Sequence, residues 1–169
     1  MEGAYFGLAT LTSPSAKKTD FTSSTFNKSN SSNMNASGAL FNKANIKDSK
    51  FTSLVAHTVS MNDATIEFSD LGEAQLQNSD LSNSIIKNSN FTLANISHTA
   101  FNNSDITNTN FTRAQLGVSD FTGSKIKNIS FTNTDLTEAI MVDAKINFTN
   151  FDGTKLRNAN FKNADLTGS

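Results

Sequence analysis

The sequence predicts an all-β solenoid whose coil has four sides and 20 residues per turn. Two observations support this. Every fifth residue from Phe41 to Leu166 is Phe, Ile, Leu or Met, with Ala56 as the exception, and the residue two places earlier is mostly Ala, Ser or Thr. Residues 20 apart also sort into columns of like side chains. A period of five is neither that of a helix nor that of an ordinary strand, so each group of five is expected to form one side of a continuous coil.

The four sides are told apart by their central residues, which should stack from coil to coil. The first two columns, the expected structural core, are nearly pure isoleucine and phenylalanine: Ile46, Ile66, Ile86, Ile106, Ile126 and Ile146 with Leu166, then Phe51, Leu71, Phe91, Phe111, Phe131 and Phe151. The third column is Phe41, Met61, Leu81, Phe101, Phe121, Met141 and Phe161, and the fourth is Ala56, Leu76, Ile96, Leu116, Leu136 and Leu156.

Individual five-residue units also match a known repeat. The units at 159–163 (Ala-Asn-Phe-Lys-Asn) and 164–168 (Ala-Asp-Leu-Thr-Gly) resemble the A(D/N)Lxx repeat of the pentapeptide repeat proteins. The resemblance covers at least residues 39–168. It implies a right-handed quadrilateral β-helix, and the handedness comes from the resemblance alone.

The chain is expected to form one β-helix domain over residues 21–169, degenerate over 21–38 and regular over 39–168. Residues 1–20 keep the five-residue frame and are interpreted as a degenerate first coil or a cap. Pro14 and the pair Lys17 and Lys18 weaken the pattern there. A disordered or capping tail to about Asp20 is therefore the alternative.

The predicted rod has open ends. With about 4.8 Å per coil, residues 39–168 should span roughly 30 Å. The last residues, Leu166 to Ser169, are still in repeat, and no C-terminal cap is visible among them. An uncovered coil end is a sheet edge with unpaired backbone groups, so self-association or docking on a protein partner is expected.

Composition favours a noncatalytic protein. The net charge is −1, from 14 basic and 15 acidic residues, and cysteine is absent. His57 and His98 are expected on the outside about two coils apart, and the aspartates that precede central residues recur with the repeat, so no acid–base pair stands out. We expect no enzyme activity, no catalytic residue, no cofactor and no metal. No signal peptide or membrane span is visible, which favours the cytoplasm without deciding the compartment.

Departures from the repeat indicate where a partner could bind. Apolar residues stand where polar ones are usual, and the candidate partner surface comprises Ile140, Val142, Phe148, Phe68 and Ile85. Bulky residues at small positions, Leu54 and Val59 beside Val55, mark a second irregular patch. The leading hypothesis is a rigid interaction module that presents its surfaces and coil ends to protein partners or to itself, with no small-molecule substrate.

Two alternatives remain. The resemblance implies a DNA-mimicking protein that binds gyrase or another topoisomerase, as in quinolone resistance, but this chain lacks the acidic rod of that class. Its isoleucine side carries several lysines (Lys47, Lys87, Lys125, Lys127 and Lys145), and a nucleic-acid partner is not favoured either. The side centred on Phe51 carries an Asn/Thr ladder, for which hydrogen bonding between stacked coils is the simpler explanation. Ordered-water or ligand binding is the minor alternative.

Overall fold

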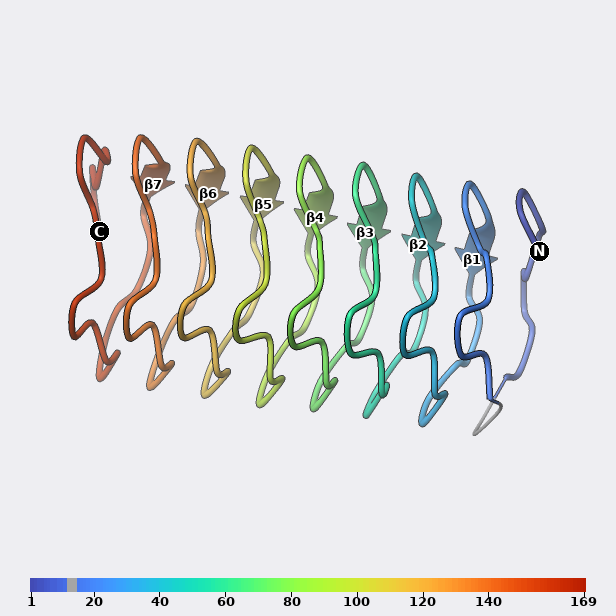
Figure 1. The fold of residues 1–169 in the computed structure, drawn as a ribbon. Coiled ribbons are helices and arrows are strands. Elements are labelled where there is room, and N and C mark those ends of the chain that lie inside the picture. The colour runs from blue at the N-terminus through green and yellow to red at the C-terminus, as the bar shows by residue number, and fades with distance from the viewer. Residues whose placement is uncertain (12–14) are drawn as a thin grey trace.

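The computed structural model describes residues 1–11 and 15–169, and it is a stack of four-sided coils that forms one rod (Figure 1). Residues that pair between adjacent coils are 20 apart in sequence, as in Ile46 with Ile66. In the described part of the chain there is no helix, and hence none that could cross a membrane. The prediction of a four-sided, all-β solenoid with 20 residues per coil is confirmed.

Only the isoleucine side forms strands of more than one residue. Within the described residues these are β1 (Thr25–Asn27), β2 (Asn45–Lys47), β3 (Thr65–Glu67), β4 (Ile85–Lys87), β5 (Asp105–Thr107), β6 (Lys125–Lys127) and β7 (Lys145–Asn147). They form one parallel sheet in the order β1 to β7, with Ile86 against Ile106. The other three sides pair through single bridges, such as Asn90 with Asn110.

Backbone hydrogen bonds join each coil to both neighbours. In one direction Lys28 N–H donates to Lys47 C=O over 3.0 Å, and in the other Asn45 N–H donates to Ser24 C=O over 2.9 Å. Both patterns recur along the rod. Residues 1–11 and 15–20 take part, through bridges such as Tyr5 with Thr25 and Thr10 with Asn30, whereas Pro14 lies outside the described residues.

The bore is filled by stacked side chains. Phe101 and Phe121 stack with ring centroids 4.7 Å apart, and Phe91 and Phe111 with centroids 5.1 Å apart. The isoleucines of the first column, from Ile46 to Ile146, are buried. Phe151 differs from the other expected core phenylalanines because it is only partly buried, in the outermost coil of the described stack.

Small central residues are compensated by larger neighbours. Leu54 and Val59, one on either side of Ala56 in sequence, are each only 1% exposed and occupy the interior. Met34 is likewise buried between Ser31 and Ala36. Leu54 and Val59, the bulky residues of the second irregular patch, therefore belong to the core, and close packing requires the space beside a short side chain to be filled.

Each corner within residues 1–11 and 15–169 contains a left-handed residue, which sequence reasoning did not predict. This residue stands two places after the central one, and its φ is 51° in Phe68 and Phe148 and 61° in Leu93 and Val118. Glycine and asparagine adopt this conformation most readily, whereas bulky and β-branched residues rarely do. The bulky residues Phe68, Leu93, Val118 and Phe148 therefore occupy corners whose backbone conformation favours glycine or asparagine.

Candidate functional site

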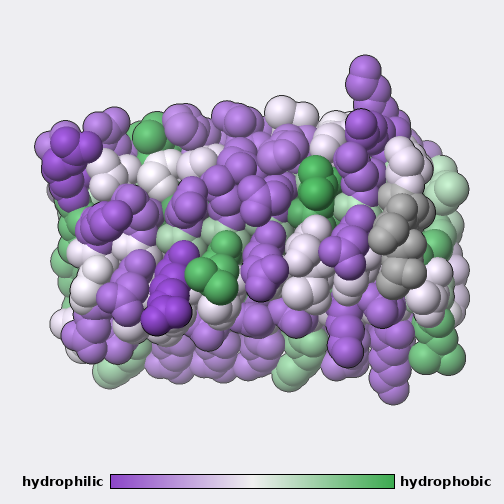
Figure 2. All heavy atoms as spheres, turned by 90° about the horizontal axis from the view of Figure 1, so that it is seen from below, coloured by the Kyte–Doolittle hydropathy of each residue, from purple (hydrophilic) through white to green (hydrophobic). Residues whose placement is uncertain are grey.

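The structure distributes the predicted partner residues over different sides of the rod. Phe68 and Phe148 occupy the same corner, just after β3 and β7, and are 54% and 59% exposed. Ile85 begins β4, at the other end of the isoleucine side. Ile140 and Val142 flank the buried Met141 on the preceding side, so they form no single patch with Phe148. In Figure 2 the visible face is mainly hydrophilic, with isolated hydrophobic patches.

An asparagine ladder separates Phe68 from Phe148 at their shared corner. Asn108 Nδ2 donates to Asn88 Oδ1 over 3.1 Å, and Asn128 Nδ2 donates to Asn108 Oδ1 over 3.0 Å. All three asparagines have positive φ. At this corner, asparagine suits the left-handed backbone in the three middle coils, whereas Phe68 and Phe148 place an exposed aromatic ring on the same unfavourable conformation.

The Asn/Thr ladder on the phenylalanine side is bonded mainly within each coil. Asn90 Oδ1 accepts from Thr92 N–H at 3.1 Å and from Thr92 Oγ1 at 2.6 Å. Bonds between coils also occur, from Asn90 Nδ2 to Asp70 at 2.8 Å and between Thr112 and Ser130 at 3.1 Å. Hydrogen bonding between stacked coils is thus only part of the explanation, because the asparagine closes a turn with the residue two places on.

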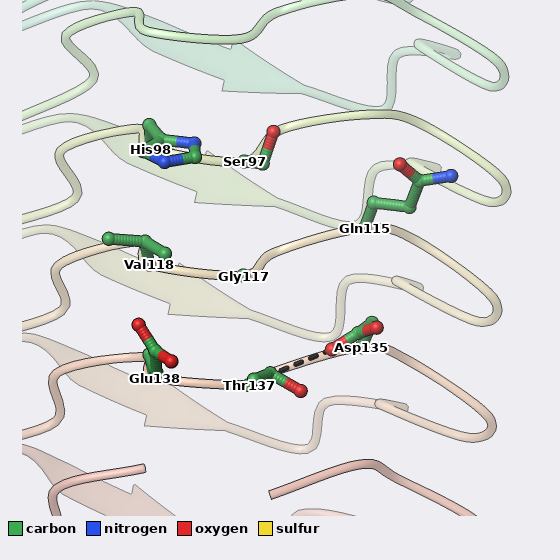
Figure 3. A pocket seen from close by; sticks show the side chains of 8 residues that line it. All are labelled: Ser97, His98, Gln115, Gly117, Val118, Asp135, Thr137 and Glu138. Carbon is green, nitrogen blue, oxygen red and sulfur yellow. Dashed lines mark hydrogen bonds between the residues drawn. The ribbon is translucent and has the colours of Figure 1, made fainter. Parts of the chain in front are cut away.

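A shallow groove of about 290 Å³ crosses the side that contains Ile96, Leu116 and Leu136 (Figure 3). Its floor is Gly117 between Ser97 and Thr137 of the neighbouring coils. One wall is formed by corner residues His98, Val118 and Glu138, and the opposite wall by Gln115 and Asp135. The groove exists because Gly117 has no side chain where the adjacent coils have a hydroxyl-bearing residue.

Gly117 is not required by the backbone. Its φ is not in the left-handed region, and a Cβ placed there would lie 3.4 Å from Thr137 O, an ordinary contact. Val118, by contrast, is β-branched with a φ of 61° and is 41% exposed. The groove thus combines an open floor with a strained, exposed apolar wall. Sequence analysis did not identify either residue.

Asp135, one of the two carboxylates that line the groove, is held by a turn hydrogen bond. Asp135 Oδ1 accepts from Thr137 N–H at 3.0 Å, and Lys155 Nζ lies 3.4 Å from Asp135 Oδ2. Hydrogen bonding from Thr137 outweighs partial burial and lowers the pKa of Asp135, with a smaller contribution from Lys155. Among the described residues no group of three metal-ligating side chains comes together.

The far end of the rod presents a second, apolar hollow of about 450 Å³. It is lined by Phe151, Leu156, Phe161 and Leu166, which are central residues of the outermost described coil. Inner coils bury the same positions; Leu136, for example, is fully buried. The exposed bore therefore has the chemistry of the core rather than that of a hydrophilic surface.

Solved structures of similar fold cover nearly the whole chain. QnrB1, a plasmid-mediated fluoroquinolone resistance protein, aligns in a trypsin-treated form with a TM-score of 0.50 and 12% identity over 97% of this chain and 92% of its own. HetL, from the cyanobacterium Nostoc sp. strain PCC 7120 and involved in heterocyst differentiation regulation, aligns with a TM-score of 0.49 and 15% identity over 96% and 89%. No curated protein matches the sequence.

A family model gives the assignment. The model described as pentapeptide repeats matches in overlapping segments at residues 60–97, 74–113, 114–147 and 143–169, with 8 copies of the repeat. Together these segments span residues 60–169, which is more than half of the chain. The chain belongs to the pentapeptide repeat family.

Proposed function

We propose that the chain is a noncatalytic protein-interaction module, a rigid rod that presents its sides and coil ends to protein partners or to further copies of itself. The observation that carries the proposal is a set of exposed apolar side chains at left-handed corners: Phe68, Leu93, Val118 and Phe148. Each bears two unfavourable features, apolar exposure and a backbone conformation that costs a residue with a Cβ roughly 1–2 kcal/mol. Contact with a partner would bury the exposed apolar surface, and a role in binding would explain why the unfavourable backbone conformation is kept.

The solenoid is suited to this role because its surface is preformed. Backbone bonds between coils and stacked phenylalanine rings hold each corner in a fixed place on the rod. A partner that binds several corners therefore loses little of its binding free energy to ordering this chain.

The polar groups favour a structural rather than a catalytic role. The aspartates and asparagines that precede central residues accept turn hydrogen bonds, as Asp120 does from Thr122 N–H at 2.8 Å and Asn110 from Thr112 N–H at 2.9 Å. Their recurrence follows from the geometry of the turn.

The experiment replaces Phe68, Leu93, Val118 and Phe148 by Asn, the residue that occupies the same position at Asn88, Asn108 and Asn128. Partners are captured from the native organism by crosslinking and identified by mass spectrometry, with wild-type and variant chains compared. We expect the variant to keep its fold and lose specific partners. A matched control carries Asn at Thr58 and Glu73, two exposed polar corners.

Equal capture by the wild type and the corner variant would refute lateral docking through these residues. The coil-end hollow is tested separately by changing Phe161 and Leu166 to Ser and measuring mass in solution by sedimentation. If neither set of changes alters capture or mass, the interaction proposal fails.

A gyrase-binding role of the quinolone-resistance type is the second candidate, supported by the similarity of fold to QnrB1. The surface charge counts against it, because Lys125, Lys127 and Lys145 are exposed on β6 and β7, and a DNA mimic requires an acidic rod. A gyrase supercoiling assay with and without fluoroquinolone distinguishes the two candidates. Ordered-water or ligand binding by the Asn/Thr ladder is less supported, since many of its polar groups bond within the coil.

A further inference from the structure

The groove in Figure 3 ends at a corner of the coil, and the side after that corner carries Ile140 and Val142. Val118 lies two residues before Asp120, and Asp120 pairs with Ile140 of the next coil. Glu138, which lies next to Val118 in the following coil, is two residues before Ile140. Val118, Ile140 and Val142, here called the corner patch, therefore lie on adjoining surfaces. The first two are 41% and 37% exposed, and Val142 is half-buried.

Acidic groups border the corner patch. Glu138 forms one wall of the groove, and Asp120 lies between Val118 and Ile140 in the stacking pattern. In the part of the chain that the structure describes, neither carboxylate forms an ion pair with a basic side chain, although Lys87 and Asp105 pair at 3.2 Å elsewhere. Partial burial would raise the pKa of Asp120, but hydrogen bonds from Thr122 and Asn102 lower it overall, so this carboxylate is ionised at neutral pH.

The shape of the groove suits one long side chain. It is open along the rod, its floor at Gly117 lacks a side chain, and Val118 offers an apolar wall beside Glu138. Long basic side chains pack their methylene stems on apolar surface and keep the charged head near an acceptor. A short apolar or acidic side chain would use only part of this arrangement.

We propose, building on the interaction role proposed above, that this surface binds a protein segment in which a basic residue adjoins an apolar one. The stem of the arginine or lysine lies over Gly117 and along Val118, and its cationic head pairs with the carboxylate of Glu138. The neighbouring apolar residue covers Ile140 and Val142, and Asp120 adds a second negative charge. Charge complementarity selects this occupant, because the corner patch alone would accept any apolar segment.

The test uses a blocked tetrapeptide of alternating arginine and leucine as the probe. It is titrated into the ¹⁵N-labelled chain, and backbone amide shifts are followed by NMR. We expect saturable shifts confined to residues 97–98, 115–120 and 135–142. The same peptide with glutamate in place of arginine should bind at least about fivefold more weakly, since the loss of an exposed ion pair corresponds to roughly 1 kcal/mol or less and the reversed charge adds repulsion.

Two substitutions in the chain probe the charge and the space separately. Glu138→Gln should weaken the arginine peptide about threefold to fivefold, whereas the matched corner change Glu73→Gln should leave binding within about twofold. Gly117→Thr restores the floor residue found at Thr137 and should weaken binding by a similar factor while the fold, followed by circular dichroism, is unchanged. If Gly117→Thr unfolds the chain, Gly117→Ala supplies a smaller filling of the same space.

The inference is overturned if the shifts spread over the whole surface, if the glutamate peptide binds as well as the arginine peptide, or if no shifts appear at millimolar peptide. Each of these outcomes leaves the interaction role itself open to its own test, because capture through Phe68 or Phe148 does not involve the groove. Loss of capture by the corner variant together with silent peptide titrations would locate docking elsewhere on the rod.

Discussion

A column of buried serines, which includes Ser49 and Ser69, allows the free-energy cost of losing one hydrogen-bond acceptor between coils to be measured. Ser69 is 3% exposed, its Oγ accepts from Ser49 N–H at 3.1 Å, and it donates to Glu67 C=O at 2.8 Å. In Ser69→Ala the N–H of Ser49 loses its acceptor inside the rod. Glu67 C=O keeps its bond from Asp48 N–H at 3.0 Å, so the penalty comes from one orphaned donor.

Ser104 is the matched control. It is 1% exposed, but its Oγ only donates, to Phe101 C=O at 2.7 Å, and that carbonyl also accepts from Ser104 N–H at 3.1 Å. Ser104→Ala therefore removes the same atom and orphans nothing. We expect a loss of unfolding free energy of about 1–3 kcal/mol for Ser69→Ala and roughly 0.5–1.5 kcal/mol for Ser104→Ala.

Urea unfolding followed by circular dichroism measures both costs, and amide exchange at Ser49 reports the orphaned group. Exchange at Ser49 should accelerate only in Ser69→Ala. Equal costs for the two variants, or an unchanged exchange rate at Ser49, would refute the idea that this serine column supplies acceptors to the coil beneath.

Three further predictions concern packing, strain and acid. Phe111→Ala removes a ring stacked between its neighbours in the column and should cost about 3–5 kcal/mol in urea unfolding, whereas a cost under about 1 kcal/mol would mean that the bore collapses around the gap. Val118→Asn should raise the unfolding free energy by about 1 kcal/mol, since Asn tolerates its left-handed backbone better, and a destabilised variant would contradict the strain argument. Because the folded pKa of Asp120 is lowered, its contribution is complete above the ordinary value of 3.8 and is lost as pH falls through the folded pKa. Asp120→Asn keeps an acceptor for Thr122 and should make stability below the ordinary pKa of 3.8 less pH-dependent, as measured by thermal unfolding; an unchanged acid profile would count against this.

The columns of central residues could be predicted because one short period fixes both the inward positions and the register. Ile86 above Ile66 and Phe111 above Phe91 follow once 20 residues close a coil. Leu54 and Val59 stand two places before a central residue, at positions that inner coils also bury, so their burial follows from the repeat. How their extra volume fits beside Ala56 could not be predicted, because it depends on the packing of several coils together.

The candidate site was less accessible to sequence reasoning. Ile140 and Val142 stood out as exceptions to the repeat, and the structure places them beside a groove that no motif marks. Gly117 and Val118 matter through an absent side chain and a backbone angle, and neither is visible in a pattern of apolar and polar letters. Bulky residues at the corner, two places after each central residue, could have been recognised as unusual only with the knowledge that the backbone there is left-handed.

The fixed 20-residue spacing between paired positions has a consequence for changes in chain length. Removing one full turn from the interior joins residues of equal phase, so Ile against Ile and Phe against Phe are restored across the junction. A deletion that is not a whole number of coils would stack different sides of the coil on one another across the junction. The stacking is thus preserved only when the chain is shortened or extended by whole coils of 20 residues. Each coil changes the length of the rod by about 4.8 Å, so the distance between its ends can be set in steps of that size.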